Sequence, residues 1–293
     1  MQNGKPTILR QWNAIDAAGI CTNDKLNFFK MRNGILACLM LLAACNQSEK
    51  GTAAHSALPP KELELTEMVN RYPDSAILLE NLVQYYRDNG DYGSALQRMG
   101  NALQKDSTNA RFWDIMATLQ FENNDTLAAI RAFEKSVDLY PKPDVIISLG
   151  VLYAQTQNPK ALAIADGLIQ ADKAAAQKEA SFIKGLYYSY SGNKQKAIPF
   201  FDACLGLDYT FMNAYQEKAI ALYDLGQYAQ SIDVLTRATT LQNNFETGYY
   251  WLGRNYEKIN KPAQAIEAYQ TALLYDPQFI EAKDALGRLG VKN

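Results

Sequence analysis

Beyond residue 60, apolar side chains recur at the three- and four-residue spacing of amphipathic helices, and the pattern itself repeats every 34 residues. The clearest unit is ETGYYWLGRNYEKINKPAQAIEAYQTALLYDPQF, residues 246–279. Its marker positions are Leu252, Gly253, Tyr256, Ala265, Tyr269, Ala272 and Pro277. Each unit therefore predicts two helices joined by a short turn.

Individual columns of the repeat keep one residue type. The eighth position must be small because two helices cross there, and it holds Val83, Ala117, Gly150, Gly185, Ala219 and Gly253. Large apolar residues stand on the second helix at Met99, Phe133, Phe201, Leu235 and Tyr269. The fifteenth position holds Gly90, Asn124, Gly192, Gly226 and Asn260. Glycine and asparagine tolerate the left-handed conformation that closes a helix, so this column predicts the turn.

These markers resemble the tetratricopeptide repeat, whose pattern runs W-x2-L-G-x2-Y, then A-x3-F, then P. The resemblance implies an all-α, right-handed α-solenoid of six helix-turn-helix units and a C-terminal capping helix. We expect a half-repeat at 61–75 and the cap at 280–293. The six units are expected at 76–109, 110–143, 144–177, 178–211, 212–245 and 246–279. The third is irregular, and its extra residues predict a longer second helix or a change in superhelical pitch around 160–180.

A second pattern, MRNGILACLMLLAACNQSEKG, begins at Met31. Arg32 precedes an apolar run of ten residues, too short to span a bilayer but typical of a secretory leader. Leu42-Ala43-Ala44-Cys45 resembles the lipobox of bacterial lipoproteins. This resemblance implies that the leader 31–44 is removed and that Cys45 is acylated.

Residues 45–60 are polar and without helical period, as in a flexible linker, which argues against a buried helix in a cytosolic protein. Residues 1–30 show no sustained period, so we expect translation to start at Met31. Asn46 after the cysteine favours an anchor in the outer membrane, facing the periplasm. An anchor in the inner membrane is the alternative.

Composition excludes several classes of function. The chain has 29 basic and 31 acidic residues, a balance without the positive surface expected for nucleic-acid binding. Its one histidine, His55, lies in the linker, which removes histidine-based triads and metal sites. Cys204 occupies a small-residue column and is predicted to be packed in the core. We therefore expect no enzyme activity, no metal and no cofactor.

In the resembled family, the first helix of each unit lines a concave groove that binds a protein or peptide. Transferring those positions predicts partner-binding residues at Arg111, Asp114, Phe121, Phe182, Tyr190, Tyr223, Tyr250 and Arg254. Aromatic residues and arginine dominate interface hot spots. The alternative, left open for each residue, is burial beneath the next repeat. A second copy of the chain is one further candidate partner.

The resulting hypothesis is a non-catalytic, lipid-anchored scaffold or adaptor in bacterial envelope assembly. By repeat number and lipobox it resembles lipoproteins that assist type IV pilus secretins and adaptors that recruit murein hydrolases. The alternative is a glycan-binding lipoprotein that uses aromatic groove residues. The near absence of insertions between repeats argues against that alternative.

Overall fold

The computed structural model describes residues 59–291, which form fourteen α-helices with no strand among them. The helices are α2 (Pro60–Arg71), α3 (Ala76–Asp88), α4 (Tyr92–Lys105), α5 (Ala110–Glu122), α6 (Thr126–Leu139), α7 (Pro143–Gln155), α8 (Lys160–Ala171), α9 (Lys173–Tyr190), α10 (Lys194–Leu207), α11 (Met212–Asp224), α12 (Tyr228–Leu241), α13 (Glu246–Lys258), α14 (Pro262–Tyr275) and α15 (Ile280–Arg288). The all-α prediction is confirmed.

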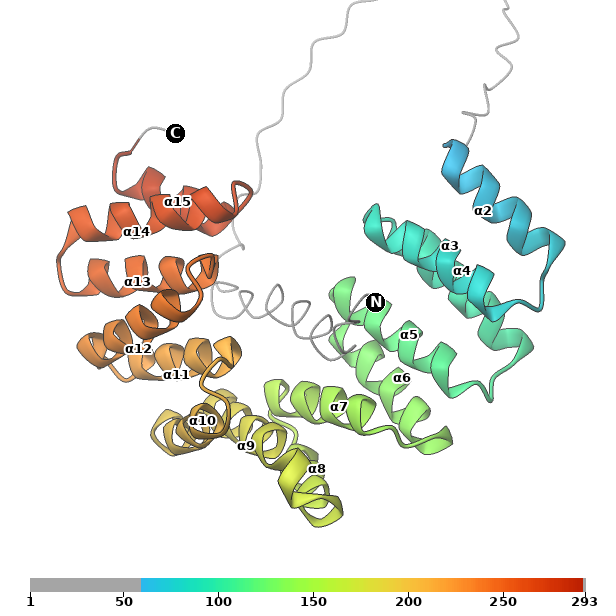
Figure 1. Cartoon of the computed structure of the whole chain (residues 1–293), viewed down its shortest axis with the longest axis horizontal. Coiled ribbons are helices and arrows are strands. Elements are labelled where there is room, and N and C mark those ends of the chain that lie inside the picture. The colour runs from blue at the N-terminus through green and yellow to red at the C-terminus, as the bar shows by residue number, and fades with distance from the viewer. Residues whose placement is uncertain (1–58, 292–293) are drawn as a thin grey trace, which may run out of the picture.

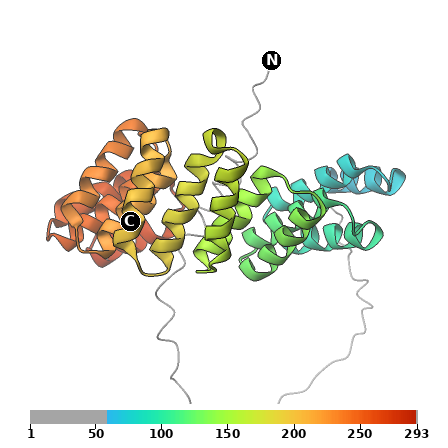
Figure 2. The same ribbon diagram turned by 90° about the horizontal axis from the view of Figure 1, so that it is seen from below.

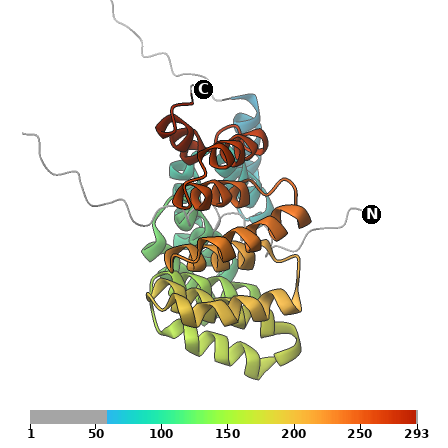
Figure 3. The ribbon, with the colours of Figure 1, turned by 90° about the vertical axis from the view of Figure 1, so that its left-hand side faces the viewer.

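Helix pairs stack one after another along an open arc from α2 to α15 (Figure 1). Each helix packs mainly against helices near it in the chain, as in solenoids built from repeats. Seen from below, the pairs lie side by side in chain order (Figure 2), and the last pairs form successive layers (Figure 3). In the middle of the arc, α7 lies on the inner side and α8 on the outer side (Figure 1).

The small eighth column lies where paired helices cross. A Cβ atom at Gly253 would stand 2.5 Å from Cε1 of Tyr269, and one at Gly150 would stand 2.9 Å from Cγ2 of Ile164 on α8. Ala117 and Ala219 are completely buried. The glycines therefore allow large apolar side chains of a neighbouring helix to rest directly on the backbone.

The turns follow the predicted column. Gly90, Asn124, Gly192, Gly226 and Asn260 all have positive φ, between 56° and 83°. In the third unit the equivalent residue is Gln157, with φ of 59°, which composition did not reveal. Second helices then begin at side-chain caps in three units, where Asp91, Asp125 and Asn193 each accept a hydrogen bond from a backbone N–H.

The irregular segment differs from the prediction of a longer second helix. Helix α8 has 12 residues, whereas the following first helix, α9, has 18. Asp172 ends α8 and caps α9, its side chain accepting a hydrogen bond from the N–H of Ala175 at 3.1 Å. Because KAAAQ after this cap is a strongly helix-forming run, the extra residues extend α9 instead.

At the C-terminal end, α15 continues the phase of the repeats and covers α14. At the other end, α2 packs on α3 as a single helix. None of the helices between residues 59 and 291 is long and apolar enough to cross a bilayer. The leader, Cys45, His55 and nearly all of the predicted linker lie outside the described residues.

Candidate binding surface

The predicted groove residues on α5 differ in exposure. Arg111 is exposed, and its guanidinium donates hydrogen bonds from Nε and Nη2 to the Glu80 carboxylate on α3, each at 2.5 Å. Phe121 is only 7% exposed. Asp114 is half-buried, and its Oδ1 has no hydrogen-bond partner among the described residues. Of these three, Arg111 offers the most surface to a partner.

The surroundings of Asp114 in the fold shift the pKa of its carboxyl. Burial raises the pKa of its carboxyl to about 6, and the nearby Asp144 carboxylate adds to the rise. Lys142 and Arg111 oppose it with positive charge. An aspartate in this position is therefore costly to keep ionised at neutral pH.

In the middle of the arc, the predicted groove is part of the core. Phe182 is 2% exposed, with its ring centroid 6.0 Å from that of Phe201 and 5.0 Å from that of Phe211. Phe211 precedes the next repeat and covers the ring. The burial alternative therefore holds for Phe121 and Phe182, which corrects their assignment to an open groove.

Tyr190, near the end of α9, is half-buried. The negative charge of Glu217 on α11 and burial together raise the pKa of its phenol. Tyr190 thus lies close to Glu217 of the next first helix and is only partly accessible.

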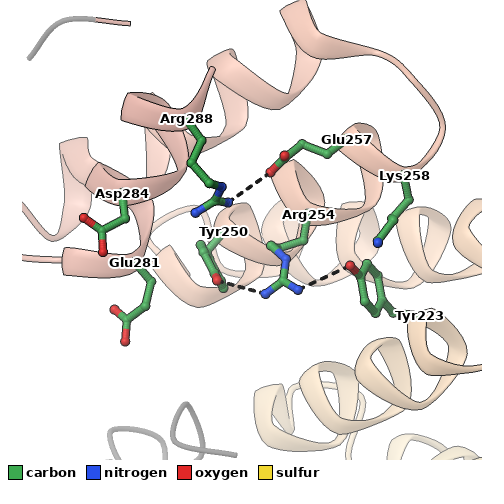
Figure 4. Close-up of a pocket in the computed structure, with 8 residues that line it drawn as sticks. All are labelled: Tyr223, Tyr250, Arg254, Glu257, Lys258, Glu281, Asp284 and Arg288. Carbon is green, nitrogen blue, oxygen red and sulfur yellow. Dashed lines mark hydrogen bonds and ion pairs between the residues drawn. The ribbon is translucent and has the colours of Figure 1, made fainter. Parts of the chain in front are cut away.

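The C-terminal part of the arc brings three predicted residues together, of which Tyr250 is as buried as Phe121, at 7% exposed. Arg254 on α13 donates hydrogen bonds to the Tyr250 hydroxyl at 3.1 Å and to the Tyr223 hydroxyl at 3.3 Å (Figure 4). Its guanidinium carbon lies 5.3 Å from the centroid of the Tyr223 ring, 5.8 Å from Tyr250 and 5.2 Å from Trp251. These contacts hold the cation in one place by cation–π attraction as well as hydrogen bonding.

A pocket of about 560 Å³ opens beside this arginine. It is lined by Tyr223, Tyr250, Arg254, Glu257, Lys258, Glu281, Asp284 and Arg288 (Figure 4). The last three belong to α15, which the sequence analysis treated only as a cap. They occupy the second, fifth and ninth positions of a seventh unit, so extending the 34-residue phase by one step would have found them.

Charge in the pocket is arranged around Arg254. Burial would lower the pKa of its guanidinium, but interactions with the phenols of Tyr250 and Tyr223 outweigh burial and raise it. Glu257 accepts a hydrogen bond from the Tyr269 hydroxyl and forms an ion pair with Arg288, whose Nη2 lies 3.6 Å from Oε1 of Glu257. Within residues 59–291, Arg254 forms no ion pair with a carboxylate.

Residues 59–291 contain neither a cluster suited to a metal ion nor an accessible thiol. From residue 59 to 291 no group of three or more histidine, cysteine or acidic side chains is placed to hold a metal ion. Cys204 is completely buried, and its Sγ donates to the backbone oxygen of Lys178 at 3.4 Å. Ser136 occupies the same column and donates to the backbone oxygen of Ala110 at 2.8 Å. Cys204 is therefore a packed core residue, and Ser136 makes the equivalent contact in an earlier repeat.

Helix pairs that stack at a regular spacing along an arc define an all-α solenoid, the architecture of repeat proteins. Sequence profiles described as tetratricopeptide repeat match residues 80–144, 179–211, 213–245 and 247–279, together more than half of the chain. This chain belongs to the tetratricopeptide repeat family.

Three known proteins illustrate the similarity. A tetratricopeptide repeat protein from Parabacteroides merdae superposes with a TM-score of 0.68 at 18% identity, over 78% of this chain and 91% of that chain. PilW, a widely conserved type IV pilus biogenesis factor, gives a TM-score of 0.56 at 17% identity, over 71% of this chain and 97% of its own. At these identities the similarity concerns the fold.

A curated relative is stress-induced-phosphoprotein 1 of Caenorhabditis elegans, 24% identical over 199 residues. The match covers 68% of this chain and 53% of the relative, so the chain spans about half of that protein's length.

Proposed function

We propose that this protein is a non-catalytic, lipid-anchored scaffold of the bacterial cell envelope that holds a protein partner against the inner face of its solenoid. The observation that carries the proposal is the Tyr223–Tyr250–Arg254 cluster, a half-buried cation without an ion pair beside an open pocket. Tetratricopeptide proteins generally mediate protein–protein interactions, and aromatic residues with arginine dominate interface hot spots.

The envelope location rests on the lipobox at 42–45. We propose that acylated Cys45 anchors the chain, with the outer membrane facing the periplasm as the favoured site. Similarity in fold to PilW, a pilus biogenesis factor, is compatible with a part in envelope assembly. Replacing Cys45 with alanine is expected to move the protein from the membrane to the soluble fraction. Retention in washed membranes would contradict the lipid anchor.

The scaffold function is tested by photo-crosslinking in the native cell. A photoreactive phenylalanine analogue at Tyr223, which lines the pocket, is expected to capture a discrete protein partner. The matched control carries the same analogue at Gln230, an exposed residue on the second helix α12. Mass spectrometry identifies the captured protein.

Capture at Tyr223 and not at Gln230 supports a partner on the inner face. Equal capture at both positions, or capture at neither, contradicts the proposal. Saturable binding of oligosaccharides to the purified protein, lost on replacing Tyr223, would instead favour the glycan-binding alternative.

A further inference from the structure

A second pocket, of about 770 Å³, lies between α2 and α4 at the N-terminal end of the arc (Figure 1). Val69, Leu79 and Phe112 contribute apolar side chains to its lining, and Arg98 and Lys105 contribute positive charge. The volume lies in the range of ligand-binding sites. None of the residues predicted for the groove lines this pocket, so it is a separate feature of the surface.

The sixth unit shows which kind of group fits at this place in a repeat. There the ring of Tyr249 on α13 stacks on the ring of Tyr275 on α14, with the centroids 5.9 Å apart. Five repeats of 34 residues earlier, the two positions hold Leu79 and Lys105, and both residues line the pocket. The first unit thus has neither of the two rings that fill the equivalent space in the sixth. The pocket therefore suits an aromatic ring that comes from outside the unit.

The two cations at this pocket have no carboxylate partner. Neither Arg98 nor Lys105 forms an ion pair among residues 59–291. Asp106 also lines the pocket, but its carboxylate accepts hydrogen bonds from the side chains of Thr108 and Asn109. An aromatic ring that is accompanied by a carboxylate therefore complements both the shape and the charge of the pocket.

The chain itself exposes a ring and a carboxylate at the edge of the pocket. Tyr72, in the turn between α2 and α3, is 55% exposed. The next two residues, Pro73 and Asp74, line the pocket. Asp74 forms no ion pair in the part of the chain that the structure describes. Because this segment and the pocket adjoin, the surface is complementary to a second copy of itself.

We propose that two copies of this protein form a two-fold symmetric dimer through this surface. Tyr72 of each copy enters the pocket of the other copy beside Leu79, and Asp74 of each copy faces Lys105 of the other. A two-fold axis makes the two contacts equivalent, because the same patch on each copy then meets itself. Tyrosines that fill a pocket are typical anchors of protein interfaces. Helices α2 and α13 lie in opposite arms of the arc (Figure 1), so the inference does not depend on the pocket at Tyr223.

The contact is tested by crosslinking between two isotopic forms of the purified full-length protein. Unlabelled protein with a photoreactive phenylalanine analogue at Tyr72 is mixed with parent protein labelled with heavy nitrogen, and the mixture is irradiated. Mass spectrometry is expected to find residue 72 of the unlabelled copy joined to a labelled peptide from residues 98–112. The matched control carries the analogue at Tyr140, which is 60% exposed and also precedes a proline, and it is expected to give no such product.

Sedimentation velocity measures the strength of the dimer in variants. Leu79→Trp fills the pocket with the ring that Trp113 supplies at the same column of the second unit. This variant is expected to weaken dimerisation about tenfold or more without lowering the urea midpoint of unfolding. Tyr72→Ala is expected to weaken dimerisation to a similar degree, whereas Tyr140→Ala is expected to leave it unchanged.

Exchange of charges identifies the polar contact. Lys105→Glu alone brings two carboxylates face to face across the dimer and is expected to weaken association about tenfold. Adding Asp74→Lys to the same chain restores opposite charges across the interface and is expected to recover most of that loss. Both positions are exposed, so these variants remain informative even where Leu79→Trp fails to fold.

The inference is overturned if the parent protein sediments as a monomer at concentrations up to about 100 μM. It is also overturned if residue 72 is joined only to unlabelled peptides, which places Tyr72 against its own copy, or if Tyr140 gives the same product. A dimer that forms equally well in Tyr72→Ala and in Lys105→Glu has a different interface and rejects the inference as well. None of these outcomes bears on the scaffold proposal, which is tested separately by capture at Tyr223.

Discussion

A Cβ atom added at Gly185 would lie 2.6 Å from Cε1 of Phe201, so the two helices of this repeat meet ring against backbone. Phe201 is completely buried and cannot move aside without disturbing its neighbours. We expect Gly185→Ala to lower the free energy of unfolding by about 1–3 kcal/mol, the usual cost of overpacking a core. Urea denaturation followed by circular dichroism measures the change.

Gly206, on the same helix as Phe201, is the matched control. A Cβ atom there would meet nothing within 4 Å. Alanine favours a helix interior over glycine, so Gly206→Ala is expected to raise the free energy of unfolding by up to about 1 kcal/mol. Equal effects at both glycines would contradict a specific role for the close contact at Gly185.

The effect of Asp114 on stability depends on pH. Its carboxyl has a pKa of about 6 in the folded protein, above the ordinary value of 3.8. The folded state therefore binds more protons than the unfolded state between these values, and stability is lost as pH rises through them. Asp114→Asn is expected to raise the free energy of unfolding by about 1–3 kcal/mol at pH 7.5.

This advantage should be much smaller at pH 4, and it should disappear well below pH 3.8, where Asp114 is protonated in both states of the parent protein. Comparison of urea midpoints at the two pH values measures the difference. A gain of the same size at pH 7.5 and pH 4 would show that the asparagine acts by packing and not by removing a charge.

Phe182 distinguishes a groove residue from a core residue. Because it is buried between Phe201 and Phe211, we expect Phe182→Ala to lower the free energy of unfolding by about 3–5 kcal/mol. Leu127→Ala is the control, since Leu127 is 65% exposed and its truncation should change stability by no more than about 0.5 kcal/mol. An unchanged melting transition in Phe182→Ala would place this ring on the open surface.

Cys204 is expected to resist alkylation in the folded protein. Burial, with a smaller contribution from Glu179, raises the pKa of its thiol to about 12, and the thiolate is the reactive form. Treatment with iodoacetamide at pH 8 should leave the Cys204 peptide unmodified in native protein and modified in guanidinium, as measured by mass spectrometry. Cys204→Ser serves to assign the peptide. Rapid modification of the native protein would indicate that the helix pair opens at this column.

Much of the fold could be predicted from the sequence, because it depends on the backbone conformation and side-chain size required at single positions. The turn residues Gly90 and Asn260 were predictable because few residues tolerate positive φ. The crossing at Gly253 was predictable because only a small residue permits contact with a large one. Both requirements recur every 34 residues, and Gln157 in the third unit is the exception at the turn. The extension of α9 was missed because the helix-forming run at 173–177 carries no marker of the repeat.

The binding surface depends on contacts between residues that are far apart in the sequence. Whether Phe182 faces a partner or the core depends on Phe211, the last residue before the next repeat, whose ring centroid lies 5.0 Å from that of Phe182. Arg254 donates a hydrogen bond to Tyr223, 31 residues earlier, and lines the same pocket as Glu281 and Asp284 of α15. The sequence by itself determined the helices and their pairing, because these depend on local spacing. The tertiary structure decided which of the candidate side chains stay open, because burial and charge pairing depend on how neighbouring repeats pack together.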